Sequence, residues 1–435
     1  MYEHWNMDVI NDLYNAFCNY PTVSVDSRNI HPGSIFFGIR GPNFNGSDFA
    51  DEALEKGAVY AVVEDSAVSD NVHFFRVKDT LATLQELARY HRNKIKAEIF
   101  AITGSNGKTT TKELCNAVLS RKFNVSSTTG NLNNHIGVPL TLLSLTKDTE
   151  IGIIEMGANH PGEIAALCDI ALPDYGLVTN IGKAHLEGFG SIEGVRKTKG
   201  ELFEFLMKNN KTIFVNENDL QVKSLLSIGY PNYVFYHNDF FNGTLISNDP
   251  FLNLKIQIAN HKFQLKTNLI GSYNIENILA AAVAGNHFGV SDDDIRLAIE
   301  EYQPDNFRSQ FIDSGRNKIV MDAYNANPSS MMLAIDNFLE MDGEKKLLII
   351  GQMLELGDTS YTEHRKIIEN LAARQFENVI YIGDHFIEAA KEMNITSYRT
   401  VEDFIAGLDP AKYHSNLIFI KGSRGNQLEK LLPLL

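Results

Sequence analysis

The chain has 435 residues, of which 44% are hydrophobic and 21% are charged, a balance typical of a folded globular protein. This length exceeds what one hydrophobic core usually organises, so two or three domains are expected. The net charge of −15 argues against a general nucleic-acid-binding face, because phosphate backbones are bound by clustered Lys and Arg.

The cysteine pattern and the N-terminal segment bear on the compartment. Cys18, Cys115 and Cys168 are scattered and form neither a disulfide framework nor a CxxC metal motif, which fits a reducing compartment. The first residues, MYEHWNMDVINDLYNAF, include acidic side chains and lack the apolar core of a signal peptide. No apolar run approaches the roughly 18 residues of a membrane span. We therefore expect a cytoplasmic protein without membrane insertion.

The first hundred residues alternate short apolar runs with polar turns. The runs at 34–39, 60–63 and 73–77 are typical of strands, and the stretch 80–95 repeats its apolar residues at helical spacing. This pattern predicts a small α/β domain over residues 1–96.

A new pattern begins near Glu98. The apolar run 99–102 predicts a buried parallel strand that ends in a glycine-rich loop, and strand-then-turn units follow at 151–157 and 175–182. Strands that alternate with helices imply a parallel sheet with right-handed crossovers. We predict a central, mostly parallel, P-loop-type ATPase domain over 97–313.

Two further patterns complete the chain. Residues 253–270 alternate apolar and polar side chains around a short turn, which predicts an antiparallel hairpin. From about residue 314, four strand-like runs, KIVMDAYN, KKLLIIG, NVIYIGD and NLIFIKG, alternate with helical stretches. They predict a Rossmann-like α/β domain over 314–435. The expected fold class is therefore α/β with three domains.

A candidate phosphate-binding loop lies between the predicted strand at 99–102 and a helix. Its residues are Thr103, Gly104, Ser105, Asn106, Gly107, Lys108 and Thr109. Backbone N–H groups of such a turn and the positive helix N-terminus bind phosphate. Lys108 can neutralise β- and γ-phosphate charge, and the Thr109 hydroxyl can bind Mg²⁺. An ordinary tight turn is the alternative, but Gly-Lys-Thr-Thr followed by a helix favours a nucleotide site.

Three more residues are candidates for chemistry near the strand ends. Glu155 closes an apolar strand, where an acid is costly unless it is paired or metal-bound. His185 follows the turn 180–182, and a lone histidine there is more often structural than a ligand. Lys199 lies on the apolar face of a predicted helix. Either its amine extends to solvent, or desolvation lowers its pKa and leaves a neutral amine that can react with CO₂ to form a carbamate.

Taken in order, these motifs resemble those of the Mur ligases of bacterial cell-wall synthesis, over nearly the whole chain. The matching segments are TGSNGKTTTK (103–112), TTGNLNNHIGVPLTLL (128–143), EMGANHPGEI (155–164), TNIGKAHLEGFGS (179–191), KTKGELF (197–203), GSYNIENILAA (271–281), DAYNANPSSM (322–331), GQMLELG (351–357) and KGSRG (421–425). The resemblance implies an ATP-dependent, ADP-forming amide ligase of peptidoglycan synthesis that works through an acyl phosphate.

The resemblance also implies roles by position. The catalytic residues would be Lys108, His185 and Lys199. The ligands of two Mg²⁺ ions would be Thr109, Glu155, His185 and a carbamylated Lys199. The ATP contacts would be the loop 103–109, Asn277 at the adenine, Arg308 near the domain boundary and Asp322 at the ribose. The substrate contacts would be Ser27, Arg28, Asn131, Asn134, Asn325 and Asn327.

The string Asp-Ala-Tyr-Asn-Ala-Asn-Pro at 322–328 favours family members that join D-alanyl-D-alanine to a UDP-N-acetylmuramoyl tripeptide. The Asp-Asn-Pro-Arg signature of members that add the third residue is absent from the sequence. The alternatives are another ligase of the superfamily, such as a folylpolyglutamate-type enzyme, a non-catalytic nucleotide-binding regulator, and a P-loop kinase or ATPase. The uridine-type segment Asp26-Ser27-Arg28 favours the Mur-type ligase, and Arg28 could bind pyrophosphate through two hydrogen bonds. A turn with a solvated arginine is the alternative for this triplet. The resemblance also implies a monomer.

Overall fold

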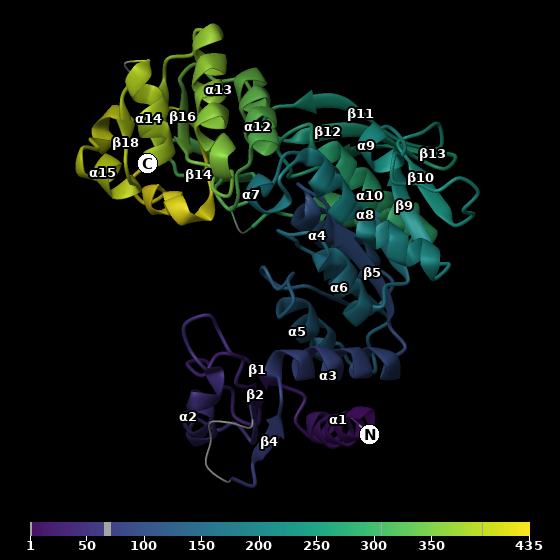
Figure 1. Ribbon diagram of the computed structural model, residues 1–435. Coiled ribbons are helices and arrows are strands. Elements are labelled where there is room, and N and C mark those ends of the chain that lie inside the picture. The colour runs from purple at the N-terminus through teal and green to yellow at the C-terminus, as the bar shows by residue number, and fades with distance from the viewer. Residues whose placement is uncertain (1, 65–70, 306, 394) are drawn as a thin grey trace.

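The computed structural model describes residues 2–64, 71–305, 307–393 and 395–435. Four sheets follow one another along the chain, and three of them are mostly or wholly parallel. In Figure 1 the N-terminal part, at the bottom, and the C-terminal part, at the upper left, both flank the central part, at the right. The predicted α/β fold class is confirmed. Within the described residues, no helix is both long enough and apolar enough to cross a membrane.

The N-terminal part is a four-stranded parallel sheet of order β1-β2-β3-β4. Its elements are α1 (Tyr2–Asn19), β1 (Val23–Ser24), β2 (Ile35–Phe37), a 3₁₀ turn (Gly46–Phe49), α2 (Ala50–Glu55), β3 (Tyr60–Glu64), β4 (Phe74–Val77) and α3 (Thr80–Lys94). The three strands and the helix α3 that the sequence predicts are all present. The helix α1 and the two-residue strand β1 are additional.

The central part contains a six-stranded, wholly parallel sheet of order β10-β9-β8-β5-β7-β6. Its strands are β5 (Glu98–Thr103), β6 (Val125–Ser127), β7 (Ile151–Glu155), β8 (Tyr175–Val178), β9 (Thr212–Asn216) and β10 (Tyr233–Tyr236). Its helices are α4 (Lys108–Leu119), α5 (Gly137–Ser144), α6 (Glu163–Ala171), α7 (Leu186–Phe189), α8 (Ile192–Lys208), α9 (Leu220–Lys223), α10 (Asn274–His287) and α11 (Asp292–Glu301). The predicted parallel sheet is confirmed.

A small antiparallel sheet of order β11-β12-β13 packs beside it. Its strands are β11 (Phe241–Asn248), β12 (Leu252–Ile258) and β13 (His261–Lys266). The predicted hairpin is β12 and β13. The third strand, β11, was not predicted, because much of it is exposed and it lacks a clear apolar alternation.

The C-terminal part is a six-stranded sheet of order β14-β15-β19-β16-β17-β18, parallel except for the edge strand β14. Its strands are β14 (Gln310–Asp313), β15 (Lys318–Asp322), β16 (Lys346–Gly351), β17 (Val379–Ile382), β18 (Ser397–Tyr398) and β19 (Leu417–Lys421), and its helices are α12 (Pro328–Glu340), α13 (Ser360–Ala373), α14 (Asp384–Glu392) and α15 (Val401–Ala406). All four predicted strands are present. The sheet begins with β14, which precedes residue 314.

The hydrophobic packing differs between the parts. One buried cluster runs from the N-terminal part, with Leu13 and Val62, into the central part, with Leu142 and Leu206. The C-terminal sheet has two clusters of its own, one of which Ile270 joins from the central part. The N-terminal and central parts therefore share one buried cluster, and each has a further cluster of its own. The C-terminal part packs largely around its own two clusters.

Arg92, near the end of α3, holds the shared core together at its edge. Its guanidinium donates hydrogen bonds to the carbonyl oxygens of Ala97 (3.1 Å), Ala171 (3.0 Å) and Leu172 (3.2 Å). It also pairs with the carboxylate of Asp174 at 2.7 Å. The helix that leaves the N-terminal sheet is thus fixed to the central sheet by one partly buried cation.

We expect Arg92→Met to lower the free energy of unfolding by about 3 kcal/mol, because it leaves buried hydrogen-bond acceptors without their donor. Urea denaturation measures this change. Arg89→Met is the matched control, since Arg89 is exposed on the same helix, and it should change the value by less than about 0.5 kcal/mol. Equal effects of the two substitutions would contradict the role given to Arg92.

Candidate active site

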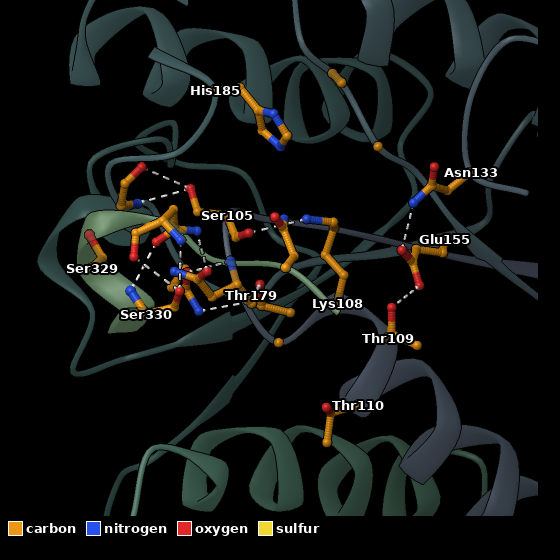
Figure 2. Close-up of a pocket in the computed structure, with 18 of the residues that line it drawn as sticks. Ser105, Lys108, Thr109, Thr110, Asn133, Glu155, Thr179, His185, Ser329 and Ser330 are labelled. Atoms are coloured by element: carbon orange, nitrogen blue, oxygen red, sulfur yellow. Dashed lines mark hydrogen bonds between the residues drawn. The ribbon is translucent and has the colours of Figure 1, made fainter. Parts of the chain in front are cut away.

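A cavity of about 680 Å³ lies where the central sheet faces the C-terminal part. Its walls include the loop after β5, the ends of β7 and β8, the start of α10 and the segment between β15 and α12. Figure 2 shows side chains from these segments converging on one space. The cavity therefore lies beyond the carboxyl ends of parallel strands, where open α/β sheets bind ligands.

Two glycines give the loop after β5 its shape. Gly104 and Gly107 have φ values of +144° and +79°, which side-chain-bearing residues rarely adopt. A Cβ atom on Gly104 would lie 1.9 Å from Thr179 Oγ1, and one on Gly107 would lie 2.5 Å from Asn277 Oδ1. Both positions therefore require glycine on two grounds, and the loop leads directly into α4 at Lys108.

The rest of the loop is anchored to the turn after β8. The N–H of Ser105 donates to the carbonyl oxygen of Asn180 (3.0 Å), and the N–H of Asn106 donates to Asn180 Oδ1 (3.0 Å). Thr103 Oγ1 donates to the carbonyl oxygen of Met156 (2.7 Å). The predicted phosphate loop is thus a rigid strand–loop–helix unit rather than an unconstrained turn.

Lys108 lies across its own loop. Its Nζ donates to the carbonyl oxygens of Gly104 (2.7 Å) and Ser105 (3.2 Å). Burial lowers the pKa of Lys108; Glu155 opposes that shift and Arg308 adds to it. The ammonium group is therefore close to the loop on which a phosphate would lie.

Glu155 ends β7 with its side chain almost fully buried, at 2% exposure. One carboxylate oxygen accepts from Thr109 Oγ1 (2.8 Å) and the other from Asn133 Nδ2 (2.8 Å). Hydroxyl and carboxylate oxygens are the ligands that Mg²⁺ prefers. Thr109 and Glu155 therefore fit a Mg²⁺ ion at the edge of the phosphate loop.

Within the described ranges, no three His, Cys, Asp or Glu side chains gather closely enough to hold a metal by themselves. His185 lines the cavity with its Nδ1 hydrogen-bonded to Glu355 of the C-terminal part. Figure 2 places His185 apart from Thr109 and Glu155, on another wall. The predicted role of His185 as a metal ligand stays a prediction.

Lys199 lies inside the protein on α8, at 1% exposure. Its Nζ donates to the carbonyl oxygen of Ala158 (3.4 Å) and lies 5.4 Å from the centre of the Phe189 ring. Burial lowers the pKa of Lys199 to about 7, and nearby Lys108 adds to the shift. The predicted apolar position is confirmed, and the alternative in which the amine extends to solvent is wrong.

The predicted adenine and ribose residues lie at two sides of the same cavity. Asn277, on α10, accepts from Thr111 Oγ1 (3.0 Å) and donates to Asn274 Oδ1 (2.7 Å). Asp322 ends β15 and pairs with Lys421 at the end of β19 (2.5 Å). Lys421 was not among the predicted site residues, although a charged residue that ends a buried apolar strand could have indicated it.

Arg308 reaches the cavity from the segment that joins the central and C-terminal parts. Its guanidinium lies 3.7 Å from the centre of the Tyr324 ring, with Arg424 5.3 Å from the same ring. Phe307 and Ser309, on either side of it, have left-handed φ values of 56° and 50°. Among the described residues, the buried Nε of Arg308 has no hydrogen-bond partner. A strained backbone thus presents an incompletely paired cation to the cavity.

The predicted substrate residues are divided between the cavity and the N-terminal part. Asn134 and Asn325 line the cavity, and Asn327 Nδ2 donates to Asn106 Oδ1 (2.7 Å). Asn131 is absent from the lining.

Ser27 and Arg28 lie in the N-terminal part, outside the cavity. Arg28 is 86% exposed and pairs with Asp26 at 2.8 Å, which holds the pKa of that carboxyl near 2. The structure thus shows Arg28 in a solvated turn, and a role in binding pyrophosphate stays a prediction.

His364, on α13, fixes the loop that carries Glu355. Its Nε2 accepts the N–H of Met353 (2.9 Å), and its Nδ1 lies 2.7 Å from the carbonyl oxygen of Ser360. An Nε2 that accepts a hydrogen bond carries no proton, so the ring is neutral. Burial lowers the pKa of His364 to about 4.

Because the pKa of His364 is lower in the folded chain than its ordinary value of 6.5, the stabilisation by the neutral ring is complete above pH 6.5. It is lost as the pH falls from 6.5 to about 4, and amounts to about 3 kcal/mol. Between pH 6.5 and about 4, the unfolding free energy of the unmodified chain should therefore fall by about 3 kcal/mol more than the unfolding free energy of His364→Gln. His414→Gln, which alters an exposed histidine of the same part, is the control and should leave the pH profile of the unmodified chain unchanged. Parallel pH profiles for the unmodified chain and His364→Gln would exclude this role.

Comparisons with known proteins bear on the whole chain. Three family descriptions match in order: "Mur ligase family, catalytic domain" at residues 19–95, "Mur ligase middle domain" at 102–285 and "Mur ligase, glutamate ligase domain" at 307–424. The UDP-N-acetylmuramoyl-tripeptide–D-alanyl-D-alanine ligase of Escherichia coli is 34% identical over an alignment of 445 positions, which covers 98% of this chain and 96% of that protein.

Two further relatives agree. The Bacillus subtilis enzyme of the same name is 32% identical over 424 residues, which cover 94% of this chain and 92% of the relative. The crystal structure of MurF ligase from Thermotoga maritima in complex with ADP superposes with a TM-score of 0.84 at 28% identity, and the match covers 95% of this chain and 96% of that one. With the phosphate loop, the buried Glu155 and the three-part fold in place, these matches establish that the chain belongs to the Mur ligase family.

Proposed function

We propose that this chain is an ATP-dependent, ADP-forming ligase that joins D-alanyl-D-alanine to UDP-N-acetylmuramoyl tripeptide in peptidoglycan synthesis. The observation that carries the proposal is the meeting of the loop 103–109, Glu155 and Asp322 in one cavity between two sheets. The relatives that align over nearly the whole chain bear the name of this activity. The T. maritima relative, which binds ADP, supports a nucleotide in the cavity.

The nucleotide would lie across the cavity from α10 to the C-terminal sheet. The loop 103–109 and Lys108 would hold the phosphates, with Arg308 as a second cation. Asn277 would contact the adenine, and Asp322, oriented by Lys421, would contact the ribose. The close approach of Gly107 in the phosphate loop to Asn277 supports this placement, because it fixes the loop beside the residue that would contact the adenine.

Thr109 and Glu155 would hold Mg²⁺, which supplies neutralisation of phosphate charge when bound. Lys199 and His185 would serve a second Mg²⁺ after carbamylation of Lys199. The buried amine supports this, because a pKa near 7 leaves a substantial neutral fraction that can attack CO₂. The carbamate would add an anionic oxygen ligand at this buried position.

The reaction would proceed in two transfers. The terminal carboxylate oxygen of the tripeptide attacks the γ-phosphorus of ATP, the bond to the β-phosphate oxygen breaks, and ADP leaves. The amine of D-alanyl-D-alanine then attacks the acyl carbon, and the tetrahedral intermediate collapses to the amide with release of phosphate. Lys108 and the loop N–H groups favour the transition state by charge neutralisation and alignment rather than by covalent chemistry.

The three parts of the chain would divide the binding of the UDP-sugar substrate, ATP and the acceptor among them. Residues 1–96 would bind the UDP-sugar, with Ser27 and Arg28 near the nucleotide. Residues 97–313 would bind ATP, with Asn131 and Asn134 toward the tripeptide. Residues 314–435 would contribute Asp322 to the ATP site and would bind the acceptor, with Asn325 and Asn327 near it. They would also exclude water from the acyl phosphate. We further propose a cytoplasmic monomer.

The direct test is release of phosphate from ATP with Mg²⁺, UDP-N-acetylmuramoyl tripeptide and D-alanyl-D-alanine. We expect release to require both substrates, and Lys108→Met to reduce kcat at least about 100-fold because the γ-phosphate loses its cation. Phosphate release that is independent of D-alanyl-D-alanine or of the tripeptide would refute the proposal. Lys122→Met, which alters an exposed lysine beyond α4, is the matched control.

A further inference from the structure

Lys112 is a buried cation for which the proposed chemistry gives no role. It lies one turn after Lys108 on α4, and its side chain is 1% exposed. Its Nζ donates to the carbonyl oxygen of Thr128 (2.5 Å) and pairs with Glu113 Oε1 (2.6 Å). Burial of an ammonium group is costly unless its hydrogen bonds are made. This cost indicates a specific role for the ammonium group of Lys112 that an apolar side chain could not fill.

The contacts of Lys112 belong to a closed ring of interactions. Thr128 directly follows β6, and its Oγ1 accepts the N–H of Glu155 (3.0 Å). The carboxylate of Glu155 accepts from Thr109 Oγ1, and Thr109 lies on α4 three residues before Lys112. The ring therefore joins the start of α4, the end of β6 and the end of β7.

A branch of the ring fixes the loop that follows Thr128. Asn133 donates to the second oxygen of Glu155 (2.8 Å), and its own carbonyl oxygen accepts the N–H of Gly157 (2.7 Å). Without the Lys112 ammonium, the Thr128 carbonyl would lose this buried donor, and the end of β6 could shift. Such a shift would move Thr128 Oγ1 away from the backbone that orients Glu155.

We propose that Lys112 is a positioning residue that acts through Thr128 to hold the Glu155 carboxylate beside Thr109, in the arrangement that binds Mg²⁺ together with the nucleotide. This inference rests on the proposed function, since it takes Thr109 and Glu155 as the Mg²⁺ ligands. A lysine with a merely structural role would affect the stability of the fold and leave the Mg²⁺ dependence of nucleotide binding unchanged in the folded protein.

Calorimetric titration with ADP, in the presence and absence of Mg²⁺, separates the two roles without requiring turnover. Mg²⁺ should tighten ADP binding to the unmodified chain. Lys112→Met should reduce the ratio of the ADP Kd without Mg²⁺ to the Kd with Mg²⁺ about tenfold or more, as expected when a group that orients a metal ligand is lost. The Kd of ADP without Mg²⁺ should change less than about threefold.

Three further variants complete the test. Thr128→Val removes the Oγ1 acceptor at nearly constant volume and should reproduce the effect of Lys112→Met. Thr128→Ser keeps the hydroxyl and should leave the Mg²⁺ dependence of ADP binding as it is in the unmodified chain. Lys122→Met is the matched control, because Lys122 also donates to backbone carbonyls, those of Phe288 and Gly289, but at the opposite end of α4.

The outcomes are distinct. An unchanged Mg²⁺ dependence in folded Lys112→Met or in Thr128→Val would overturn the inference and leave the proposed ligase activity standing. If Lys112→Met does not fold, Thr128→Val decides alone, since it keeps the buried lysine. If Mg²⁺ does not tighten ADP binding to the unmodified chain, both the metal site and the inference are refuted.

Discussion

The arrangement of the site depends on one buried carboxylate, that of Glu155. An acid at 2% exposure within a parallel sheet is stable only if donors or a cation lie beside it. Thr109 and Asn133 donate to its two oxygens, and Thr128 accepts its N–H. Because these residues come from α4 and from the loop after β6, satisfying one carboxylate determines how three segments meet. The same contacts set the phosphate loop against the end of β7, where Thr109 and Glu155 would hold the Mg²⁺ proposed above to neutralise phosphate charge.

The C-terminal part meets this site through polar contacts. Asn327 donates to Asn106 of the phosphate loop, and Lys183 pairs with Glu363 at 3.1 Å. The N-terminal part, by contrast, shares a buried apolar cluster with the central part and is fixed by Arg92. Partly exposed polar pairs such as Lys183–Glu363 are individually weak, and the apolar packing across this boundary includes Ile270 in a cluster of the C-terminal part. That difference suits a ligase that must admit three ligands before it excludes water.

Much of this fold could be predicted from the sequence where the local pattern is strong. Four of the six strands of the C-terminal sheet, β15, β16, β17 and β19, are continuous apolar runs, as are β5, β7 and β8. Strands buried on both faces usually have this pattern. The position of Lys199 followed from helical spacing alone. The strands β1 and β18 have two residues each, and β11 is largely exposed, so neither length nor pattern indicated them.

The site was predictable only in part, because several of its contacts join residues far apart in the chain. Asp322 and Lys421 meet through the pairing of β15 with β19, which only the sheet order determines. The contact of His185 with Glu355 and the stacking of Arg308 on Tyr324 likewise depend on how the parts pack. No local pattern encodes such contacts. Arg28 shows the converse, since its guanidinium pairs with Asp26, only two residues away.

Activation of a carboxylate by phosphoryl transfer in the cavity can be tested by following oxygen from the substrate. UDP-N-acetylmuramoyl tripeptide labelled with ¹⁸O in its terminal carboxylate would be converted in the presence of ATP, Mg²⁺ and D-alanyl-D-alanine, and the released phosphate analysed by mass spectrometry. An acyl phosphate intermediate requires one carboxylate oxygen to leave with each phosphate, so we expect ¹⁸O in the released phosphate. Phosphate that carries no label while the amide product forms would contradict it.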